Sequence, residues 1–128
     1  MSEQLEANKG IVRDFYNLAV NGQQPEAAVA QYLGPTYRQH NPSAADGPEP
    51  LIAFMRDLIT RYPMVHIDCK RQVAEGDLVV IHSQLIREPG DRGTAVVDIF
   101  RLEHGKLVEH WDVMQEVPAS SANDNTMF

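Results

Sequence analysis

The chain has 128 residues, the length of one ordinary domain, and its 43% apolar content is typical of a protein that buries a core. Its net charge of −7 disfavours nucleic acid and anionic membranes as partners, because both are bound through basic surfaces. A single cysteine, Cys69, excludes a disulfide within the chain, and the five histidines lack the close spacing of a metal site. Since neither a secretory signal nor a membrane span is recognisable, we expect a cytoplasmic location.

The N-terminal half of the sequence predicts three helices. Apolar residues at three- and four-residue steps indicate an amphipathic helix over residues 5–20. A second helix is expected over residues 25–33, opened by a proline, and a third over about 48–62, stopped by the next proline. Between the last two, Pro42 biases the residue before it toward an extended conformation, so residues 37–42 should form a short strand or a turn.

From Val65 the apolar period changes from about 3.6 to 2, which indicates strands. Four are expected, over residues 65–74, 78–88, 94–103 and 107–116. Short glycine-containing connections favour antiparallel pairing of consecutive strands. The expected fold class is therefore α+β, with three N-terminal helices on one face of a four-strand antiparallel meander. Residues 1–116 should form the single domain and residues 117–128 a tail, whose terminal Met-Phe could dock on a subunit surface.

Polar residues interrupt the apolar stripes of three of these strands, and they are the candidates for chemistry. Strand alternation places His82 and Gln84 on one stripe, Asp98 with Phe100 on the next, and His110 with Asp112 on the last. A carboxylate on an apolar face is costly unless it is paired, and such groups tend to have perturbed pKa values. If the sheet curves under the helices, one pocket would collect these side chains.

Structural explanations compete with this interpretation. An antiparallel sheet can expose one face to water, and a buried Asp–His pair can serve packing alone. Tyr16 and Phe54 can be either core or pocket wall. Trp111 falls on the opposite face from Asp112, where it would pack in a dimer or a core. The outward stripes, which we assign to Val79, Ile81, Leu85, Val97, Ile99, Trp111 and Val113, are too apolar to be left in water, so a homodimer is expected.

Three segments resemble the SnoaL-like polyketide cyclase branch of the nuclear transport factor 2-like superfamily. They are residues 37–42 (YRQHNP), 98–102 (DIFRL) and 105–113 (GKLVEHWDV). The resemblance implies the cone-like α+β roll of that superfamily, which is also called cystatin-like. It does not fix a reaction, because the superfamily includes cyclases, isomerases, epoxide hydrolases, dehydratases and plain binding domains.

Individual positions carry further implications of the resemblance. Asp112 stands where the cyclases keep their catalytic aspartate, and His40 falls where relatives place a pocket asparagine. His82 and Gln84 replace the Arg and Asp of the epoxide hydrolases, which argues against epoxide hydrolysis. Asp98 replaces a histidine expected in the cyclases, so the balance of acid and base can differ.

The function expected from sequence is a lyase or isomerase without a cofactor or metal, closing a small carbonyl compound by an aldol-type step. Its partner is then a small organic ligand. Asp112 would act as base, His82 or His40 would hold carbonyl oxygens, and Asp98 would orient a histidine or donate a hydrogen bond. The substrate-binding candidates are Tyr16, Phe54, Gln84, Phe100 and His110. Two alternatives stay open, a non-catalytic binding domain of the same fold and a dimerisation module without a ligand.

Overall fold

Helices precede most of the sheet along residues 2–128, the part of the chain that the computed structural model describes. In chain order the elements are α1 (Ser2–Tyr16), the π-helical turn η1 (Asn17–Asn21), α2 (Pro25–Tyr32), β1 (Leu33–Gln39), α3 (Pro48–Arg61), β2 (His66–Glu75), β3 (Leu78–Ile86), β4 (Thr94–Glu103) and β5 (Lys106–Glu116). None of the helices within these residues has the length and apolar content needed to cross a membrane. The mixed α+β class expected from sequence is confirmed.

The sheet has five strands, so the expected count of four is wrong. Its order is β1-β5-β4-β3-β2, with β2 to β5 antiparallel and β1 parallel to β5. The extra strand begins directly at the end of α2, and its Gly34-Pro35 looks like a helix stop in the sequence. Gly34 permits the pairing, because a Cβ there would lie only 2.8 Å from Val108 Cγ1 on β5.

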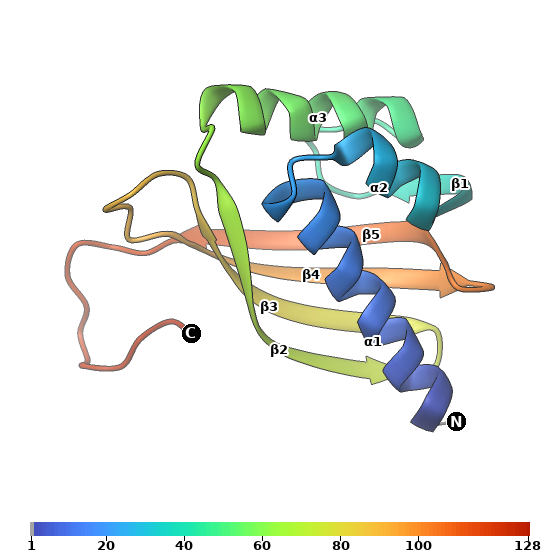
Figure 1. The fold of residues 1–128 in the computed structure, drawn as a ribbon. Coiled ribbons are helices and arrows are strands. Elements are labelled where there is room, and N and C mark those ends of the chain that lie inside the picture. Colours follow the sequence, from blue (N-terminus) through green and yellow to red (C-terminus); the bar gives the residue numbers. More distant parts are fainter. Residues whose placement is uncertain (1) are drawn as a thin grey trace.

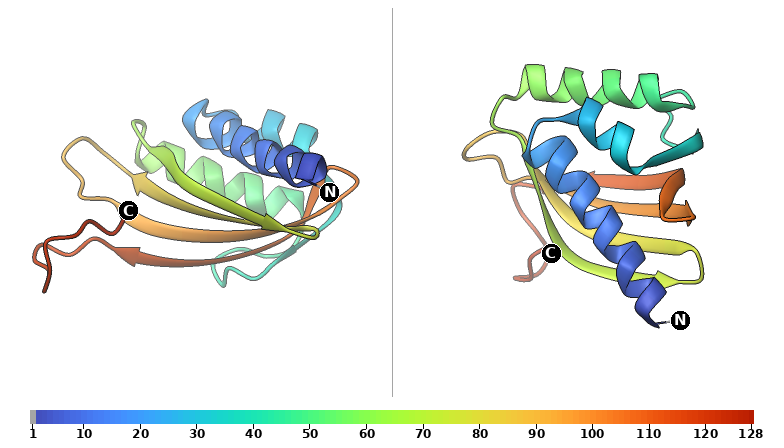
Figure 2. Two further views of the ribbon diagram at one scale, coloured as in Figure 1. Left: turned by 90° about the horizontal axis from the view of Figure 1, so that it is seen from below. Right: turned by 45° about the vertical axis from the view of Figure 1, so that its right-hand side comes forward.

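The helices cover one face of the sheet, which curves toward them (Figures 1 and 2). The core lies between these two layers, and Val12, Phe15, Ile81 and Phe100 are among its most completely buried side chains. The end of the first helix is tied to β2 by Asn21, whose amide donates to the Ile67 carbonyl at 2.9 Å and accepts from the Ile67 N–H at 2.8 Å. This contact fixes how the helix approaches the sheet and so positions Tyr16.

Strand faces follow the expected alternation in β4 but not in β3. On β4 the buried residues are Thr94, Val96, Asp98, Phe100 and Leu102. On β3 the buried set is Val79, Ile81, Ser83 and Leu85, which places His82 and Gln84 on the outer face. The expected concave placement of His82 and Gln84 is therefore wrong, and so is the outward placement of Val79, Ile81 and Leu85. Both stripes of β3 are apolar, so alternation alone cannot choose between them.

The last residues run away from the sheet and return along its outer side (Figure 1). The Val117 N–H donates to the Gly93 carbonyl at 3.0 Å. The Phe128 ring then stacks on His82 with centroids 5.9 Å apart, and the Lys70 ammonium lies 5.7 Å from the same ring. The terminal aromatic side chain thus rests on the outer face of β2 and β3.

Candidate active site

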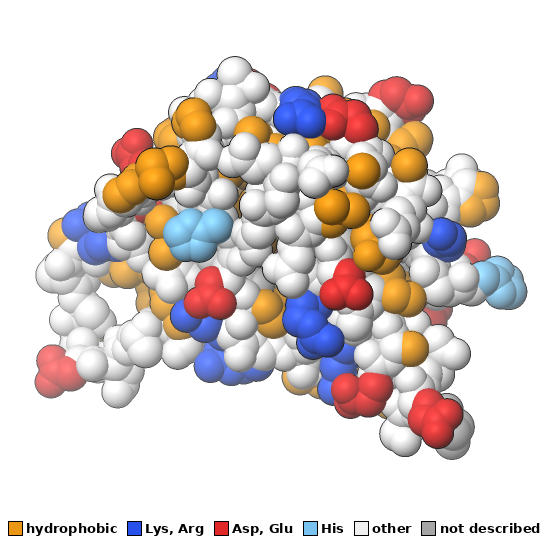
Figure 3. Space-filling model, in the orientation of Figure 1, with side chains coloured by type: hydrophobic (Ala, Val, Ile, Leu, Met, Phe, Trp, Pro, Cys, Tyr) orange, Lys and Arg blue, Asp and Glu red, His pale blue; other side chains and the backbone are white. Residues whose placement is uncertain are grey.

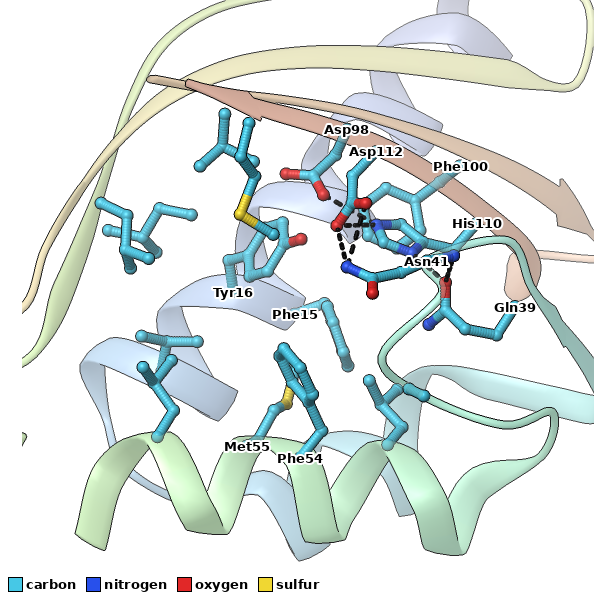
Figure 4. Close-up of a pocket in the computed structure, with 18 of the residues that line it drawn as sticks. Phe15, Tyr16, Gln39, Asn41, Phe54, Met55, Asp98, Phe100, His110 and Asp112 are labelled. Atoms are coloured by element: carbon cyan, nitrogen blue, oxygen red, sulfur yellow. Dashed lines mark hydrogen bonds and ion pairs between the residues drawn. The ribbon is translucent and has the colours of Figure 1, made fainter. Parts of the chain in front are cut away.

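A cavity of about 80 Å³ lies between the helices and the inner face of the sheet. Its walls are mostly apolar and aromatic. Most of its polar side chains gather at one end, on β4, β5, the end of β1 and the residues just after it (Figure 4). The lining residues used below are Tyr16, Tyr37, Gln39, Asn41, Phe54, Asp98, Phe100, His110, Asp112 and Met114. An apolar pocket with a few convergent polar groups is the usual form of a small-molecule site.

Asp98 and His110 form a buried pair on neighbouring strands. Asp98 Oδ1 lies 2.7 Å from His110 Nε2, and the two side chains are 1% and 7% exposed. The other ring nitrogen, Nδ1, lies 2.7 Å from Gln39 Oε1. Both imidazole nitrogens therefore have a hydrogen-bond partner, which fixes the ring against rotation.

Asp112 is held by Asn41, the residue that follows His40 at the end of β1. Asn41 Nδ2 lies 3.0 Å from Asp112 Oδ1 and 2.9 Å from Oδ2. The Asn41 Oδ1 atom accepts the backbone N–H of Ser43 at 2.8 Å, so its amide nitrogen must face Asp112. Asp112 Oδ2 also lies 3.9 Å from His110 Nε2, which brings the two carboxylates to one imidazole.

Burial raises the pKa of three groups that line the cavity. It raises the pKa of Asp98, against a smaller lowering by the hydrogen bond from His110. Burial, followed by the charge of Asp98, also raises the pKa of Tyr16 well above its usual value, and the pKa of Tyr37 is raised for the same two reasons. The two phenols are therefore protonated at neutral pH and can donate hydrogen bonds into the cavity.

One oxygen of Asp98 is unpaired. Within residues 2–128, Oδ2 has no hydrogen-bond partner at donor distance although it is fully buried. The Tyr16 hydroxyl is the nearby donor that favours its ionised form (Figure 4). A buried acceptor without a partner is costly, so this oxygen is a natural contact point for a ligand group.

Aromatic rings support the polar groups from below. The Phe100 ring centroid lies 4.6 Å from that of His110 and 5.7 Å from that of Tyr16. Phe15 meets Phe100 edge-on at 6.1 Å. Because these rings are packed in the core, the imidazole and the phenol have little freedom to move.

The structure brings together six of the residues expected from sequence. They are Asp98, Asp112, His110, Tyr16, Phe54 and Phe100, and all line the cavity. His82 and Gln84 do not, since they lie on the outer face of β3. There the His82 ring contacts Arg71 and Phe128, and Gln84 Nε2 donates to the Arg92 carbonyl at 3.2 Å.

His40 also lies outside the cavity, so its expected reach into the pocket is wrong. Its ring stacks on Trp111 with centroids 4.7 Å apart and planes 5° apart, and Nε2 lies 2.8 Å from Glu109 Oε2. Contacts with His40 and then Arg101 lower the pKa of Glu109. The pocket position that the resemblance gave to residue 40 belongs to Asn41. Neighbouring residues of an extended segment point to opposite sides, so the error is an offset of one.

Asn41, Gln39 and Tyr37 are site residues that the sequence analysis missed. They alternate along β1 and the residues just after it, so a parallel pairing with β5 would have predicted that they share a face. Without that pairing, the sequence leaves open whether the segment is a strand or a turn, and so which of its side chains share a face.

Among residues 2–128, Asp98, His110 and Asp112 form a group that could ligate a metal, because their ligand atoms lie within 4.8 Å of one another. These atoms are already engaged, since Nε2 of the imidazole faces Asp98 and both Asp112 oxygens face Asn41. The arrangement is a closed hydrogen-bonded acid–base group. It fits proton transfer better than metal binding, because a metal would have to replace those hydrogen bonds.

Charge around the cavity is negative, since its described lining includes two aspartates and neither lysine nor arginine. On the face of the molecule drawn in Figure 3, basic and acidic side chains are interspersed and form no continuous basic area. A carboxylate or phosphate ligand would therefore meet no counter-charge within the described cavity.

Solved structures of other proteins share this fold. TsrD from Streptomyces laurentii is 24% identical, with a TM-score of 0.72 over 85% of this chain and 88% of that one. A candidate polyketide cyclase from Bacillus cereus is 19% identical, with a TM-score of 0.72 over 84% and 74% of the two chains. AclR from Streptomyces galilaeus, a candidate hydroxylase, is 17% identical, with a TM-score of 0.69 over 89% and 82%. At these identities the likeness concerns the fold alone.

The amino-acid sequence itself matches one family. No curated protein matches the chain, but residues 12–110 match the SnoaL-like domain. The match covers most of the pocket residues, from Phe15 to His110, and ends two residues before Asp112. It agrees with the resemblance noted in the sequence. The chain belongs to the SnoaL-like domain family, a branch of the nuclear transport factor 2-like superfamily.

Proposed function

We propose that the chain is a cofactor-independent lyase or isomerase of the aldol-type cyclase class, acting on a small uncharged carbonyl compound. One observation carries the proposal. The Asp112 carboxylate is held by Asn41 at the polar end of an apolar cavity, beside the buried Asp98–His110 pair. A positioned base near proton donors in a mostly apolar pocket is the arrangement that general acid–base catalysis needs. The candidate cyclases among the structural relatives agree with it.

The chemical step divides between three groups. Asp112 takes a proton from the carbon between two carbonyls, and the resulting enolate carbon attacks the carbon of a further carbonyl group in the same molecule. A carbon–carbon bond forms and the attacked carbonyl becomes an alkoxide, which needs the one proton that Asp112 has removed. The Tyr16 and Tyr37 hydroxyls, which burial keeps protonated, are placed to stabilise the developing oxyanion. Return of the proton from Asp112 completes a reaction in which no atom is gained or lost.

The charge of the cavity selects the substrate. Two carboxyl groups without a lysine or arginine in the described lining disfavour acids and phosphate esters. Aromatic and aliphatic walls, including Phe54 and Met114, favour an apolar carbon skeleton. We therefore expect neutral diketones or enones rather than carboxylated metabolites.

A non-catalytic binding domain is the second candidate. The polar groups of the cavity mostly bond one another, which also suits a site that only holds a ligand. Both candidate functions use the same pocket, so only a measurement of proton transfer to or from the ligand can distinguish them.

The test is deuterium exchange at the acidic carbon of small β-dicarbonyl compounds, followed by NMR in deuterated water. The wild-type chain should accelerate the exchange, and Asp112→Asn should slow the catalysed rate by about a hundredfold or more while ligand binding persists. Asp68→Asn is the matched control, because Asp68 lies on β2 with an exposed side chain bonded to Lys70. Unchanged exchange in Asp112→Asn would remove its role as base. Binding by the wild type without exchange would favour the binding domain.

We also propose that the active form is a homodimer in the cytoplasm, where Cys69 stays reduced. The outer face of β4 and β5 presents Val113, 68% exposed, beside Trp111, Val97 and Ile99. A second copy would cover this apolar surface. Sedimentation equilibrium at micromolar concentration should give the dimer mass, and Val113→Asp should give the monomer. A wild-type monomer would contradict the proposal.

A further inference from the structure

The amide of Gln39 can be oriented in only one way. Its Oε1 atom accepts the backbone N–H of Asn41 at 3.0 Å, and a backbone N–H is always a donor. The same Oε1 atom lies 2.7 Å from Nδ1 of His110. An acceptor that close requires a proton on the partner, so Nδ1 carries its hydrogen.

A fixed hydrogen on Nδ1 determines what Nε2 can do. If the imidazole is neutral, Nε2 is an acceptor, and its 2.7 Å contact with Asp98 Oδ1 requires a proton on Asp98. If Nε2 also carries a hydrogen, the ring is an imidazolium and Asp98 is a carboxylate. Either way, one proton lies between the two residues.

We propose that Gln39 is a positioning residue, which holds the Nδ1 hydrogen of His110 so that His110 and Asp98 keep one shared proton between them and Asp112 is left to act as the base. The kinetic part of this inference rests on the proposed function, whereas the proton arrangement does not. Without an acceptor at residue 39, the neutral ring would place its only hydrogen on Nε2. Asp98 and Asp112 would then both be charged beside a neutral imidazole, and the site would hold one proton fewer.

The surroundings favour the shared proton. Burial raises the pKa of Asp98, which opposes a bare carboxylate there. Asp112 Oδ2, 3.9 Å from Nε2, favours a hydrogen on that nitrogen. The other titratable groups lining the cavity are Tyr16 on α1 and Tyr37 on β1, and α3, β2 and β3 contribute only apolar lining residues.

The decisive measurement needs no substrate. In protein labelled with ¹⁵N-histidine, long-range proton–nitrogen correlations report which ring nitrogen carries hydrogen, and the His110 signals are assigned by their loss in His110→Asn. We expect the wild type to show hydrogen on Nδ1 throughout the neutral pH range. Gln39→Leu should convert His110 to the Nε2–H tautomer, so that Nδ1 no longer carries a hydrogen. Gln39→Glu, which keeps an acceptor, should retain the Nδ1 hydrogen.

Gln84→Leu is the matched control, because Gln84 lies on the outer face of β3. It should leave the His110 signals unchanged. A wild-type His110 in the Nε2–H tautomer would overturn the proposal, and so would an Nδ1 hydrogen that survives in Gln39→Leu. If Gln39→Leu does not fold, the wild-type and Gln39→Glu spectra still decide the question.

A kinetic measurement separates this inference from the proposed function. On a compound that the wild type turns over, Gln39→Leu should lower kcat by about tenfold or more with little change in KM. The alkaline limb of its pH profile should move to lower pH, because the site loses its shared proton sooner, and Gln39→Glu should restore both. An unchanged pH profile in a folded Gln39→Leu would refute the role in catalysis. If no compound turns over, the proposed function fails while the NMR result still stands or falls alone.

Discussion

Replacing Gly34 with alanine should destabilise the fold, although most replacements of glycine by alanine in regular elements do the opposite. A Cβ at residue 34 would lie 2.8 Å from Val108 Cγ1 and 3.4 Å from Lys106 Cβ. Non-bonded carbons normally approach to about 3.5–4.0 Å, so Val108 would have to retreat by about 0.7 Å or more. Val108 is 3% exposed, which leaves it little free space.

The expected cost combines two opposing effects. Overpacking of a filled site costs about 1–3 kcal/mol. Alanine restricts the unfolded chain more than glycine does, which offsets about 0.4–1 kcal/mol of that cost. The net loss should be about 1–2 kcal/mol, which lowers the Tm of a domain of this size by roughly 5 °C.

Urea and thermal denaturation of four variants would test this reasoning. Gly10→Ala is the control, because the new Cβ would lie 3.8 Å from a side-chain nitrogen of Arg13, which is an ordinary contact distance. Gly10 lies within α1, where alanine should stabilise the fold by about 1 kcal/mol. Val108→Ala should relieve the clash, so the double variant with Gly34→Ala should lose at least about 1 kcal/mol less than the sum of the single losses. A Gly34→Ala protein as stable as the wild type, or additive behaviour in the double variant, would refute the close packing of β1 on β5.

Two further predictions concern the core and the surface. Phe100→Ala should lower the free energy of unfolding by about 3–5 kcal/mol in urea denaturation, because the ring is 1% exposed and packs on Phe15 and His110. The hydrogen bond from Arg56 lowers the pKa of Glu26 to about 2 in the folded protein. The contact therefore stabilises the fold fully at pH values above the pKa of the unfolded carboxyl, and this stabilisation is lost as the pH falls from there toward about 2. Glu26→Gln should therefore melt below the wild type at neutral pH, and the difference should shrink as the melts are repeated toward about pH 2.

Much of the fold could be predicted from periodicity. The three helices and the strands β2 to β5 appear near their expected positions, because long amphipathic segments dictate their own elements. On β4 one aspartate lies in an apolar stripe, and on β5 a histidine and an aspartate do. Asp98, His110 and Asp112 could therefore be placed on the inner face. A single charged residue in an apolar stripe is a strong signal, because only a partner makes its burial tolerable.

The errors have a common physical origin in ambiguous alternation. On β3 both stripes are apolar, and the more polar stripe with His82 and Gln84 faces outward because Ser83 is the only polar residue that the inner face has to bury. At His40 the direction of the side chain depends on where β1 pairs with β5, and the register of that pair shifts between Leu33 and Arg38. A shift of one residue exchanges the two faces, which is how Asn41 rather than His40 enters the pocket.

The sequence predicts only a short strand or a turn at residues 37–42, and β1 overlaps them at residues 37–39. The rest of β1 could not be found locally, because the strand depends on a pairing with another strand about seventy residues later in the chain. Yet this strand and the residues after it set the polarity of the whole site. Gln39 Oε1 accepts the N–H of Asn41, and Asn41 Oδ1 accepts the N–H of Ser43, so each amide is oriented by the backbone two residues ahead. Gln39 must then accept from His110, and Asn41 must donate to Asp112. In the spacing Gln-x-Asn-x-Ser, the backbone thus leaves the glutamine as an acceptor and the asparagine as a donor. Parallel pairing then sets this segment against a strand that carries His and Asp two residues apart, so the glutamine meets the histidine and the asparagine meets the aspartate.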